Sequence, residues 1–412
     1  MSHIAVRVLF IRLALSAGLL ISCLQLSAPP CRAQAQLLAS PTFAPSTGAL
    51  SGSESAMLPT LFPSSHAANL LVLRNGDILC FSFSGTREGE SNVAIVVSRL
   101  AKGSQTWDPA VLVDREAGKS YQNPVPMEDA KGRIWLFHTS QSAGKGQADS
   151  QVLKVYSDDG GKTWSKQEIL FGKAGSYLRQ PTVAGQGGEL LLPIYYSTSE
   201  GITHGAETNY SVVEISKDAG KTWRECPVPE SGGLVQMNII RLRPRSYVAF
   251  FRSRYADFVY RSTSSNGCEW SRPEKTVLPN NNASIQATRL RNGDIVMAFD
   301  NTRGKSTEHK TQTGPRAPLS VATSPDAGIT WTAVRDLEIP DSAANPALNS
   351  PGAGNTIEFP GKEEYSYPSI IQTPTGQILV AYTYRRLAIK AVIFEESWIE
   401  RGTTLGIYKS VK

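Results

Sequence analysis

Polar and charged side chains recur at one phase of a repeated strand pattern, and their types suit the binding of an acidic ligand. Arginine carries a planar guanidinium that matches a carboxylate in bidentate fashion. A tyrosine hydroxyl or a glutamate carboxyl beside it can act as nucleophile or as general acid and base. Taken singly, each such residue is more often an exposed charge. Because they share one phase of the repeat, we expect them to meet in one pocket. The set comprises His66, Gln122, Asn123, Arg179, Gln180, Gln236, Arg252, Arg316 and Tyr367.

A repeated eight-residue turn indicates the elements that position these side chains. Copies at 157–164, 216–223 and 324–331 all read Ser-x-Asp-x-Gly-x-Thr-Trp. Ser and Asp can accept hydrogen bonds from nearby backbone, Gly permits a positive φ, and Trp can pack on the neighbouring sheet. We expect Asp158 to be such an acceptor. A degenerate copy at 263–270 has Ser in place of Asp.

The spacing of these turns predicts a ring of β-sheets. The Trp of each turn recurs every 50–60 residues or so, which suits four-stranded propeller blades. Six segments also read as strand, tight turn and strand. These hairpins are 70–83, 127–139, 183–196, 239–252, 287–299 and 370–382. A fifth and more degenerate turn at 98–107 keeps little beyond its Trp. Six hairpins with five Trp-marked turns predict that one blade contains strands from both ends of the chain. We therefore expect an all-β, six-bladed β-propeller.

Composition fits one large domain and excludes several partners. The 412 residues include 34 Gly and 25 Pro, 41% are hydrophobic and 19% are charged, which supplies enough apolar material for a core. The net charge is +6 without a basic run interleaved with aromatics, so no nucleic-acid partner is expected. No Cys/His spacing or Asp-rich loop indicates a metal or another cofactor. We expect a monomer.

The N-terminal residues 1–35 are expected to form a signal peptide. Arg7 and Arg12 precede an apolar run at 13–22, and small residues at 31–35 supply cleavage points. The apolar run is too short for a transmembrane span. The protein is therefore expected to be secreted or periplasmic.

The N-terminus has one alternative interpretation, and two further segments follow it. Residues 20–23 have the form of a bacterial lipoprotein signal, in which Cys23 would carry a lipid anchor. Residues 36–60 are rich in Ser, Pro, Ala and Gly and predict a flexible leader. Residues 61–400 are expected to form the propeller and to carry the catalytic site.

The cysteines of the expected propeller limit its crosslinks. Cys80, Cys226 and Cys268 offer at most one disulfide because their number is odd. Cys80 lies within an expected inner strand, where a buried thiol is favoured.

The repeated turns and the six hairpins resemble the sialidase (neuraminidase) superfamily, in which such turns are known as Asp boxes. The resemblance covers roughly residues 60–395. It implies a Tyr nucleophile paired with a Glu, an Asp acid/base and three Arg that hold the substrate carboxylate. Residues 364–368, Glu-Tyr-Ser-Tyr-Pro, look like the family's entry to its last inner strand and imply that Tyr367 is the nucleophile. Arg252 and Arg316 are similar in position to two of the three Arg.

Three positions depart from the family pattern. His66 stands where the first Arg is expected, and Gln236 replaces the Glu that partners the Tyr. The acid/base loop at 85–90 reads Gly-Thr-Arg-Glu-Gly-Glu and offers Glu88 or Glu90 in place of Asp. The expected catalytic residues are Tyr367, Glu88 and Gln236, and the expected substrate-binding residues are His66, Arg87, Asn123, Arg179, Arg252 and Arg316.

These residues favour a glycosidase that acts on a terminal acidic sugar, sialic acid or a relative. A neutral Tyr nucleophile avoids repulsion from the carboxylate of such a sugar. With a pKa of about 10 it needs a base, and because Gln236 cannot take the proton, Glu363, Glu364 or neutral His66 would have to. The alternatives are a carbohydrate-binding propeller without catalysis, or a hydrolase or lyase directed at uronic acid or rhamnose.

Overall fold

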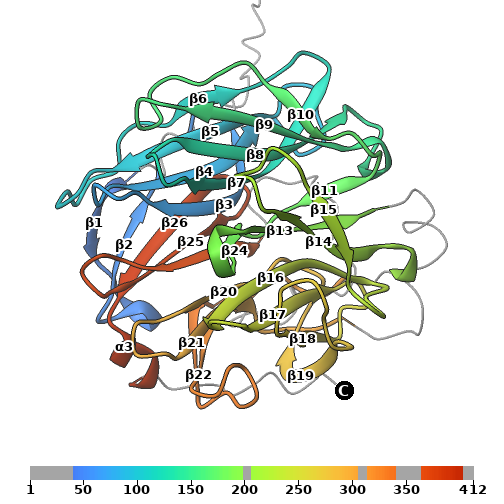
Figure 1. The fold of residues 1–412 in the computed structure, drawn as a ribbon. Helices are drawn as coiled ribbons and strands as arrows, with labels where there is room; N and C mark the ends of the chain where they lie inside the picture. The colour runs from blue at the N-terminus through green and yellow to red at the C-terminus, as the bar shows by residue number, and fades with distance from the viewer. Residues whose placement is uncertain (1–39, 198–205, 305–312, 340–362, 402–412) are drawn as a thin grey trace, which may run out of the picture.

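The strands of the protein form six sheets arranged around one axis (Figure 1). The computed structural model describes residues 40–197, 206–304, 313–339 and 363–401. The expected six-bladed propeller is confirmed over these residues. The expected signal peptide and Cys23 lie outside them. No helix in the described ranges is long and apolar enough to cross a membrane.

Blades 1 to 3 follow one another along the chain, each with its first strand innermost. Blade 1 contains β3 (Ser64–Val72), β4 (Ile78–Gly85), β5 (Ala94–Leu100) and β6 (Val111–Asp114). Blade 2 contains β7 (Lys119–Glu128), β8 (Ile134–Ser142), β9 (Gln151–Ser157) and β10 (Glu168–Phe171). Blade 3 contains β11 (Ser176–Leu178), β12 (Val183–Ala184), β13 (Leu190–Tyr196), β14 (Tyr210–Ser216) and β15 (Arg224–Pro227).

Blades 4 and 5 repeat the pattern, and blade 6 closes the ring. Blade 4 contains β16 (Leu234–Arg243), β17 (Ser246–Ser253), β18 (Phe258–Ser264) and β19 (Glu274–Pro279). Blade 5 contains β20 (Gln286–Arg289), β21 (Ile295–Asp300), β22 (Leu319–Ser324) and β23 (Ala333–Glu338). Blade 6 has the order β1 (Ser40–Pro45), β2 (Glu54–Met57), β26 (Ala388–Phe394), β25 (Ile378–Tyr384) and β24 (Tyr365–Gln372).

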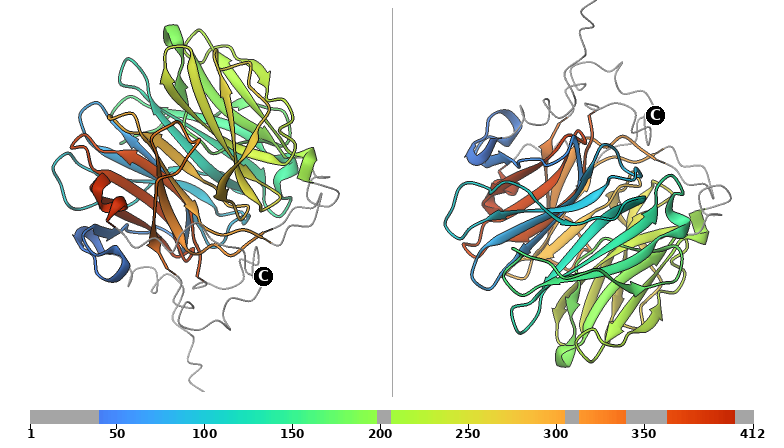
Figure 2. Two further views of the ribbon diagram at one scale, coloured as in Figure 1. Left: turned by 90° about the horizontal axis from the view of Figure 1, so that it is seen from below. Right: turned by 90° about the horizontal axis from the view of Figure 1, so that it is seen from above.

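Blade 6 therefore combines both ends of the described chain, as expected from the hairpin count. Figure 2 shows the blue N-terminal strands beside the red C-terminal ones. The expectation of a flexible leader over 36–60 is wrong for residues 40–57, because β1 and β2 pair with each other and β2 pairs with β26. Phe43 and Ala56 are buried in the core between blades 6 and 1. Short helices complete the described elements: η1 (Gly48–Leu50), η2 (Gln147–Asp149), η3 (Gln186–Gly188), η4 (Ala206–Thr208) and α3 (Glu396–Glu400).

Apolar side chains fill the spaces between adjacent blades. Between blades 1 and 2, Phe81 and Ile95 share one buried cluster with Leu136 and Leu153. Trp164 of the first Asp box packs edge-on against Phe81 with ring centroids 5.8 Å apart. Each fully buried side chain of this size contributes about 1.5–3 kcal/mol, so the blades hold one another through these layers.

The Asp-box turns connect the third and fourth strands of their blades. In the first box, the backbone N–H groups of Lys162 and Thr163 donate to Asp159 Oδ1, each at 2.9 Å. The acceptor is thus Asp159, whereas the expected Asp158 pairs with Arg133 on the surface. The turn at 263–270 is one residue shorter, so that Asn266, rather than Ser265, takes the acceptor role. Because strands alternate in direction, these turns lie at the end of each blade opposite the start of its inner strand.

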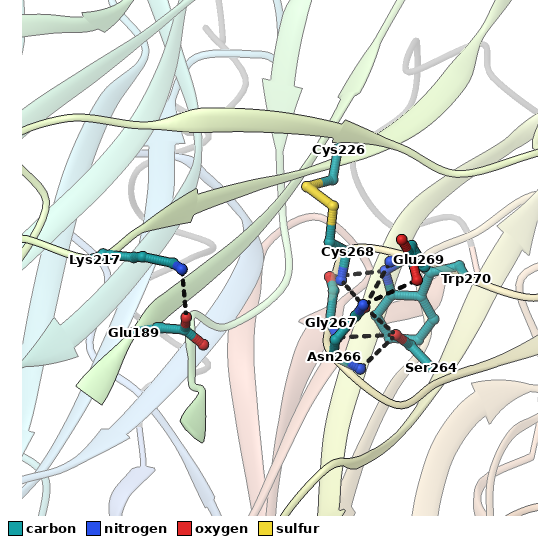
Figure 3. The surroundings of a disulfide bond; sticks show 9 residues. All are labelled: Glu189, Lys217, Cys226, Ser264, Asn266, Gly267, Cys268, Glu269 and Trp270. Carbon is teal, nitrogen blue, oxygen red and sulfur yellow. Dashed lines mark hydrogen bonds and ion pairs between the residues drawn. A yellow bond between two sulfur atoms is a disulfide. The ribbon is translucent and has the colours of Figure 1, made fainter. Parts of the chain in front are cut away.

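One disulfide joins blade 3 to the degenerate turn of blade 4 (Figure 3). Cys226 in β15 bonds Cys268, with Cα atoms 5.2 Å apart. Lys217 and Glu189 form an ion pair nearby. Cys80 is free and buried within β4. The expectation of at most one disulfide and of a buried Cys80 thiol agrees with this arrangement.

Candidate functional site

Bulges in the inner strands shape the end of the propeller where the expected site residues lie. In β3, β7, β16 and β24 the pairing with the next strand shifts register over a short stretch. The residues inside these shifts are Ala67, Asn123, Gln236 and Tyr367, with φ of 59°, 52°, 53° and 53°. Such conformations cost of order 1–3 kcal/mol for residues other than glycine and concentrate at functional sites.

Tyr367 lies at the centre of the candidate site. Nη1 of Arg252 donates to its hydroxyl oxygen at 2.6 Å. The guanidinium carbons of Arg179, Arg252 and Arg316 lie 5.8, 5.6 and 5.4 Å from its ring centroid. Burial acts to raise the pKa of Tyr367, but Arg252 and Arg316 outweigh it and lower this pKa below its usual value of 10. Tyr365, by contrast, is buried in the core between blades 5 and 6.

Arg179, which was expected to contact the substrate, lies near Tyr367, with its guanidinium carbon 5.8 Å from the ring centroid. Its Nε and Nη1 have no hydrogen-bond partner among the described residues. Its side chain is fully buried. Nη2 donates to the carbonyl oxygens of Ala68, Tyr367 and Pro368 at 2.8, 3.1 and 3.1 Å. Burial lowers the pKa of Arg179 to about 10, so it stays a cation at neutral pH. Arg179 therefore crosslinks the bulges of β3 and β24 and supports the left-handed conformation of Tyr367.

His66 packs against Tyr367 as an uncharged ring. The two ring centroids are 4.2 Å apart. Thr383 Oγ1 lies 2.7 Å from His66 Nδ1 and also accepts the backbone N–H of Ala67 at 3.1 Å. The hydroxyl proton is satisfied when it is donated to Nδ1, which leaves the imidazole proton on Nε2. Burial first, and then Arg386, lower the pKa of His66 well below 6.5, so the ring is neutral at physiological pH.

This assignment argues against His66 as the base for Tyr367. Nδ1 is occupied by Thr383, and Nε2 carries the proton and has no hydrogen-bond partner among the described residues. His66 is thus a neutral donor at the position where the family resemblance implies a cation.

Gln236 and Asn123 are buried in the bulges of β16 and β7, 3% and 4% exposed. Gln236 lies beside the hydroxyl of Tyr195, and its Oε1 has no hydrogen-bond partner in the described part of the chain. An amide cannot take a proton from a phenol, so Gln236 supplies polarity without base chemistry.

Four charged side chains from three blades form a continuous ion-pair chain at the site. Arg386 donates from Nη1 to Glu88 Oε2 at 2.6 Å and from Nε to Glu364 Oε1 at 2.9 Å. Arg316 Nη1 donates to the same Glu364 oxygen at 2.6 Å. All four side chains are 12–25% exposed. Burial opposes ionisation of Glu364, but Arg316 and Arg386 outweigh it and hold its pKa well below 4.5.

The ion-pair chain consists of Glu88, Arg386, Glu364 and Arg316, and it brings together two expected site residues. Arg87 and Glu90 do not join it. The Arg87 side chain is 50% exposed and pairs with Glu90 at 2.7 Å. Because Arg87 and Glu88 are sequence neighbours in a loop, their side chains leave the backbone in different directions, and only Glu88 reaches Arg386.

Asp300 is a buried carboxyl beside the arginines that sequence reasoning missed. Asn281 Nδ2 donates to its Oδ2 at 2.9 Å, and Oδ1 is buried without a partner among the described residues. Burial raises the pKa of Asp300 to about 8, although the Asn281 hydrogen bond and Arg316 oppose the shift. Asp300 is therefore mainly protonated at pH 7.

A signal in the sequence could have found Asp300 and Arg386. Arg252 lies near the end of β17, the second strand of its blade. Asp300 ends β21, Arg386 follows β25 and Glu88 follows β4, which are also second strands. The ends of the second strands meet the starts of the inner strands at one end of the propeller, so this phase also marks the site.

The site as a whole is cationic. Two carboxylates, Glu88 and Glu364, face four arginines near Tyr367, because His66 and Asp300 are mainly uncharged at pH 7. The four arginines are Arg179, Arg252, Arg316 and Arg386. Clustered guanidinium groups of this kind attract anions and favour a phenolate over a phenol. Within the described ranges, no three His, Cys, Asp or Glu side chains are grouped as a metal site requires.

Comparisons with known proteins agree with this architecture. Residues 76–380 match the family model described as BNR repeat-like domain. The sialidase of Paraclostridium sordellii is 28% identical over 182 residues, 38% of this chain and 44% of that protein, so the chain matches less than half of this curated relative's length.

Solved structures extend the likeness to the fold. The Hadza microbial sialidase Hz136 superposes with a TM-score of 0.63 at 15% identity, over 82% of this chain and 67% of that chain. A protein of unknown function from Dyadobacter fermentans gives 0.60 at 16% identity, over 82% and 97%. At these identities the likeness concerns the fold alone. The chain therefore belongs to the BNR repeat-like domain family and has the six-bladed propeller fold of sialidases.

Proposed function

We propose that the protein is an exported exo-glycosidase that removes a terminal sugar bearing a carboxylate, sialic acid or a relative. The observation that carries this proposal is the surroundings of Tyr367. Its hydroxyl accepts a hydrogen bond from Arg252, and the guanidinium of Arg316 lies over the same ring. A tyrosine whose pKa is lowered by arginines is a better nucleophile, and the same arginines suit a substrate carboxylate.

The proposed reaction proceeds in two steps with Glu88 as acid and base. Tyr367 Oη attacks the anomeric carbon while Glu88 gives a proton to the departing glycosidic oxygen. Water then attacks the glycosyl-tyrosine, Glu88 takes the water proton, and the bond to Tyr367 breaks. Glu88 suits this role because it is a quarter exposed and can exchange protons with solvent.

In this proposal arginine side chains, and not a neighbouring base, activate Tyr367. Glu364 accepts from Arg316, Arg386 and Ser366, at 2.6, 2.9 and 2.7 Å. All three bonds go to Oε1, and because Arg316 and Arg386 hold the pKa of Glu364 well below 4.5, this carboxylate is a weak base. The short hydrogen bond from Arg252 instead stabilises the phenolate directly, and the tyrosyl proton passes to solvent.

A sialidase relative and the disulfide of this chain support an exported, sialidase-like enzyme. The Paraclostridium sordellii relative is a sialidase, and the Cys226–Cys268 disulfide is typical of proteins that fold outside the cytosol. Lipid anchoring through Cys23 remains an alternative for the N-terminus.

A carbohydrate-binding propeller without catalysis is the second candidate. The observation in its favour is Gln236, which occupies the position of the expected carboxylate partner of Tyr367 and cannot accept its proton. The two candidates share the cationic site and differ only in whether Tyr367 reacts.

The test is a trapped adduct on Tyr367. The purified protein is screened against aryl glycosides of sialic acid, uronic acids and rhamnose, and then incubated with a fluorinated analogue of the best substrate. Mass spectrometry should find the analogue on Tyr367, and Tyr367→Phe should abolish both labelling and turnover while acidic glycans still bind. Tyr365→Phe is the matched control, because its hydroxyl meets Arg385 outside the site.

The outcomes separate the candidates. Glycan binding with neither adduct nor turnover on any glycoside would establish the binding propeller. Turnover of uronides or rhamnosides, but not of sialosides, would redirect the substrate assignment. An adduct on Tyr365 would refute the role given to Tyr367.

A further inference from the structure

Arg386 is shared between two carboxylates with different tasks. Its Nη1 bonds Glu88, the proposed acid/base, and its Nε bonds Glu364, which also holds Arg316. The residues come from the loop after β4, the turn between β25 and β26, and the segments before β24 and β22. Their side chains are all largely buried, so the charges are only partly screened by water.

The ion-pair chain couples a substrate carboxylate bound at Arg316 to the protonation of Glu88. An acid group that binds Arg316 competes with Glu364 for that guanidinium. Glu364 then depends more on Arg386, and the hold of Arg386 on Glu88 weakens. The added negative charge also favours protonation of a nearby carboxylate. Both effects act in the same direction, toward a protonated Glu88.

We propose that Arg386 is a positioning residue that loads the general acid: binding of a substrate carboxylate at Arg316 releases Arg386 from Glu88, which then takes a proton from solvent. The inference rests on the proposed function for the roles of Glu88 and Arg316. The loaded proton passes to the glycosidic oxygen as that bond breaks and the bond from Tyr367 forms. After hydrolysis the sugar acid departs, Arg386 returns to Glu88, and the proton taken from water leaves to solvent.

Loading of this kind makes the substrate's acid group a requirement for chemistry as well as for binding. A neutral sugar leaves the ion-pair chain closed and Glu88 bound to Arg386.

A few titratable groups of the described structure face the ion-pair chain. Tyr367 and Tyr177 lie within electrostatic range of Glu88, and His66 lies within range of Glu364. Asp300 lies within range of Glu364 and Arg316, and burial raises its pKa to about 8. Tyr177 and His66 are uncharged at neutral pH, because burial raises the pKa of Tyr177 well above 10 and lowers that of His66 well below 6.5.

The test compares pH profiles of kcat/KM for Arg386→Gln, Arg386→Lys and the wild type. Because Arg386→Gln lacks the cation, the alkaline limb of its profile should move to higher pH by about one unit. Arg386→Lys keeps the charge and should leave the limb near its wild-type position. Arg385→Gln is the matched control, since Arg385 lies in the same turn with a similar positive φ of 53° and its guanidinium bonds Tyr365. Arg385→Gln should leave both limbs of the kcat/KM profile at their wild-type positions.

A structural role alone would give a different pattern. If Arg386→Gln lowers kcat at every pH by the same factor and leaves both limbs in place, the loading role is wrong. Substrates with activated aryl leaving groups need little proton donation, so the shift should be largest for natural glycosides. An equal shift for both substrate types would also overturn the proposal.

A second measurement does not depend on turnover. The side-chain carboxyl of Glu88, identified with Glu88→Gln, is titrated by ¹³C NMR in protein with and without saturating N-acetylneuraminate. Bound sugar acid should raise the midpoint of the Glu88 titration by about one pH unit in the wild type and much less in Arg386→Gln. An unchanged midpoint refutes loading even in an active enzyme. An inactive protein that shows the shift would refute the proposed function and still support the coupling.

Discussion

The buried carboxyl of Asp300 should make folding stability depend on pH in a way that one substitution removes. Its side chain lies beside the arginines of the site, is 1% exposed and accepts a hydrogen bond from Asn281. Burial raises its pKa from 3.8 to about 8. Asp300→Asn removes the titration and keeps the shape, and the new amide oxygen can still accept from Asn281.

The sign follows from proton binding in the two states. Between pH 4 and pH 8 the folded protein keeps a proton on Asp300 that the unfolded chain has released, so stability falls as pH rises. Relative to strong acid, where Asp300 is protonated in both states, this group lowers the free energy of unfolding by about 2 kcal/mol at pH 5 and about 4 kcal/mol at pH 7. The loss between the two pH values, about 2–3 kcal/mol, requires only that the pKa in the folded state stays near or above 7.

The assay is urea unfolding followed by tryptophan fluorescence at pH 5, 6 and 7. The unfolding free energy of Asp300→Asn relative to wild type should rise by about 2–3 kcal/mol from pH 5 to pH 7, and the difference cancels the contribution of all other titrating groups. Asp158→Asn is the control, since this aspartate is 59% exposed and pairs with Arg133. It should change the unfolding free energy by less than about 1 kcal/mol.

Parallel pH dependences for wild type and Asp300→Asn would refute the reasoning. They would mean that Asp300 is ionised in the folded protein at pH 7, held by the arginines around it. The site would then carry an additional negative charge, and its preference for acidic sugars would need another explanation.

Three further predictions follow from individual contacts. Arg316→Lys should weaken binding of acidic sugars by about 10- to 100-fold in calorimetry and that of neutral sugars little; equal losses for both would remove the carboxylate from the model. Replacing Cys226 and Cys268 by Ser should lower the unfolding free energy by about 4 kcal/mol, since the disulfide closes a loop with a sequence separation of 42, and unchanged urea midpoints would contradict it. Asp159→Ala should lower the thermal midpoint more than Asp158→Ala, because hydrogen bonds to the Asp159 carboxylate lower its pKa and the resulting stability is lost as pH falls; similar midpoints across pH would count against this.

The sequence by itself determined the architecture, because the signals that specify it are local. The Ser-x-Asp-x-Gly-x-Thr-Trp turns form hydrogen bonds within five residues, as between Asp159 and Thr163. Hairpins show through apolar alternation on either side of a turn dipeptide. The repeat of both signals predicts six blades and the closure of the last one. The phase of the repeat also placed Tyr367, Arg252 and Arg316 at one end of the propeller.

Contacts between distant segments were decided only by the tertiary structure. Residues 40–57 look like a flexible leader because the segment is rich in Ser, Pro, Ala and Gly, but its strands pair with each other and with β26 at the other end of the described chain. Arg179 was expected at the substrate, and the structure adds that its Nη2 donates to carbonyl groups more than a hundred positions away in the sequence.

The chemistry of the site depends on the same long-range contacts. Arg386 joins Glu88 to Glu364 across nearly three hundred residues, and Asp300 has its pKa set by burial. Burial and charge pairing depend on every segment that surrounds a side chain, and those segments are brought together only when the ring of blades closes. Local pattern therefore specified the scaffold, and closure of the propeller specified the protonation states and partners of the residues at its axis.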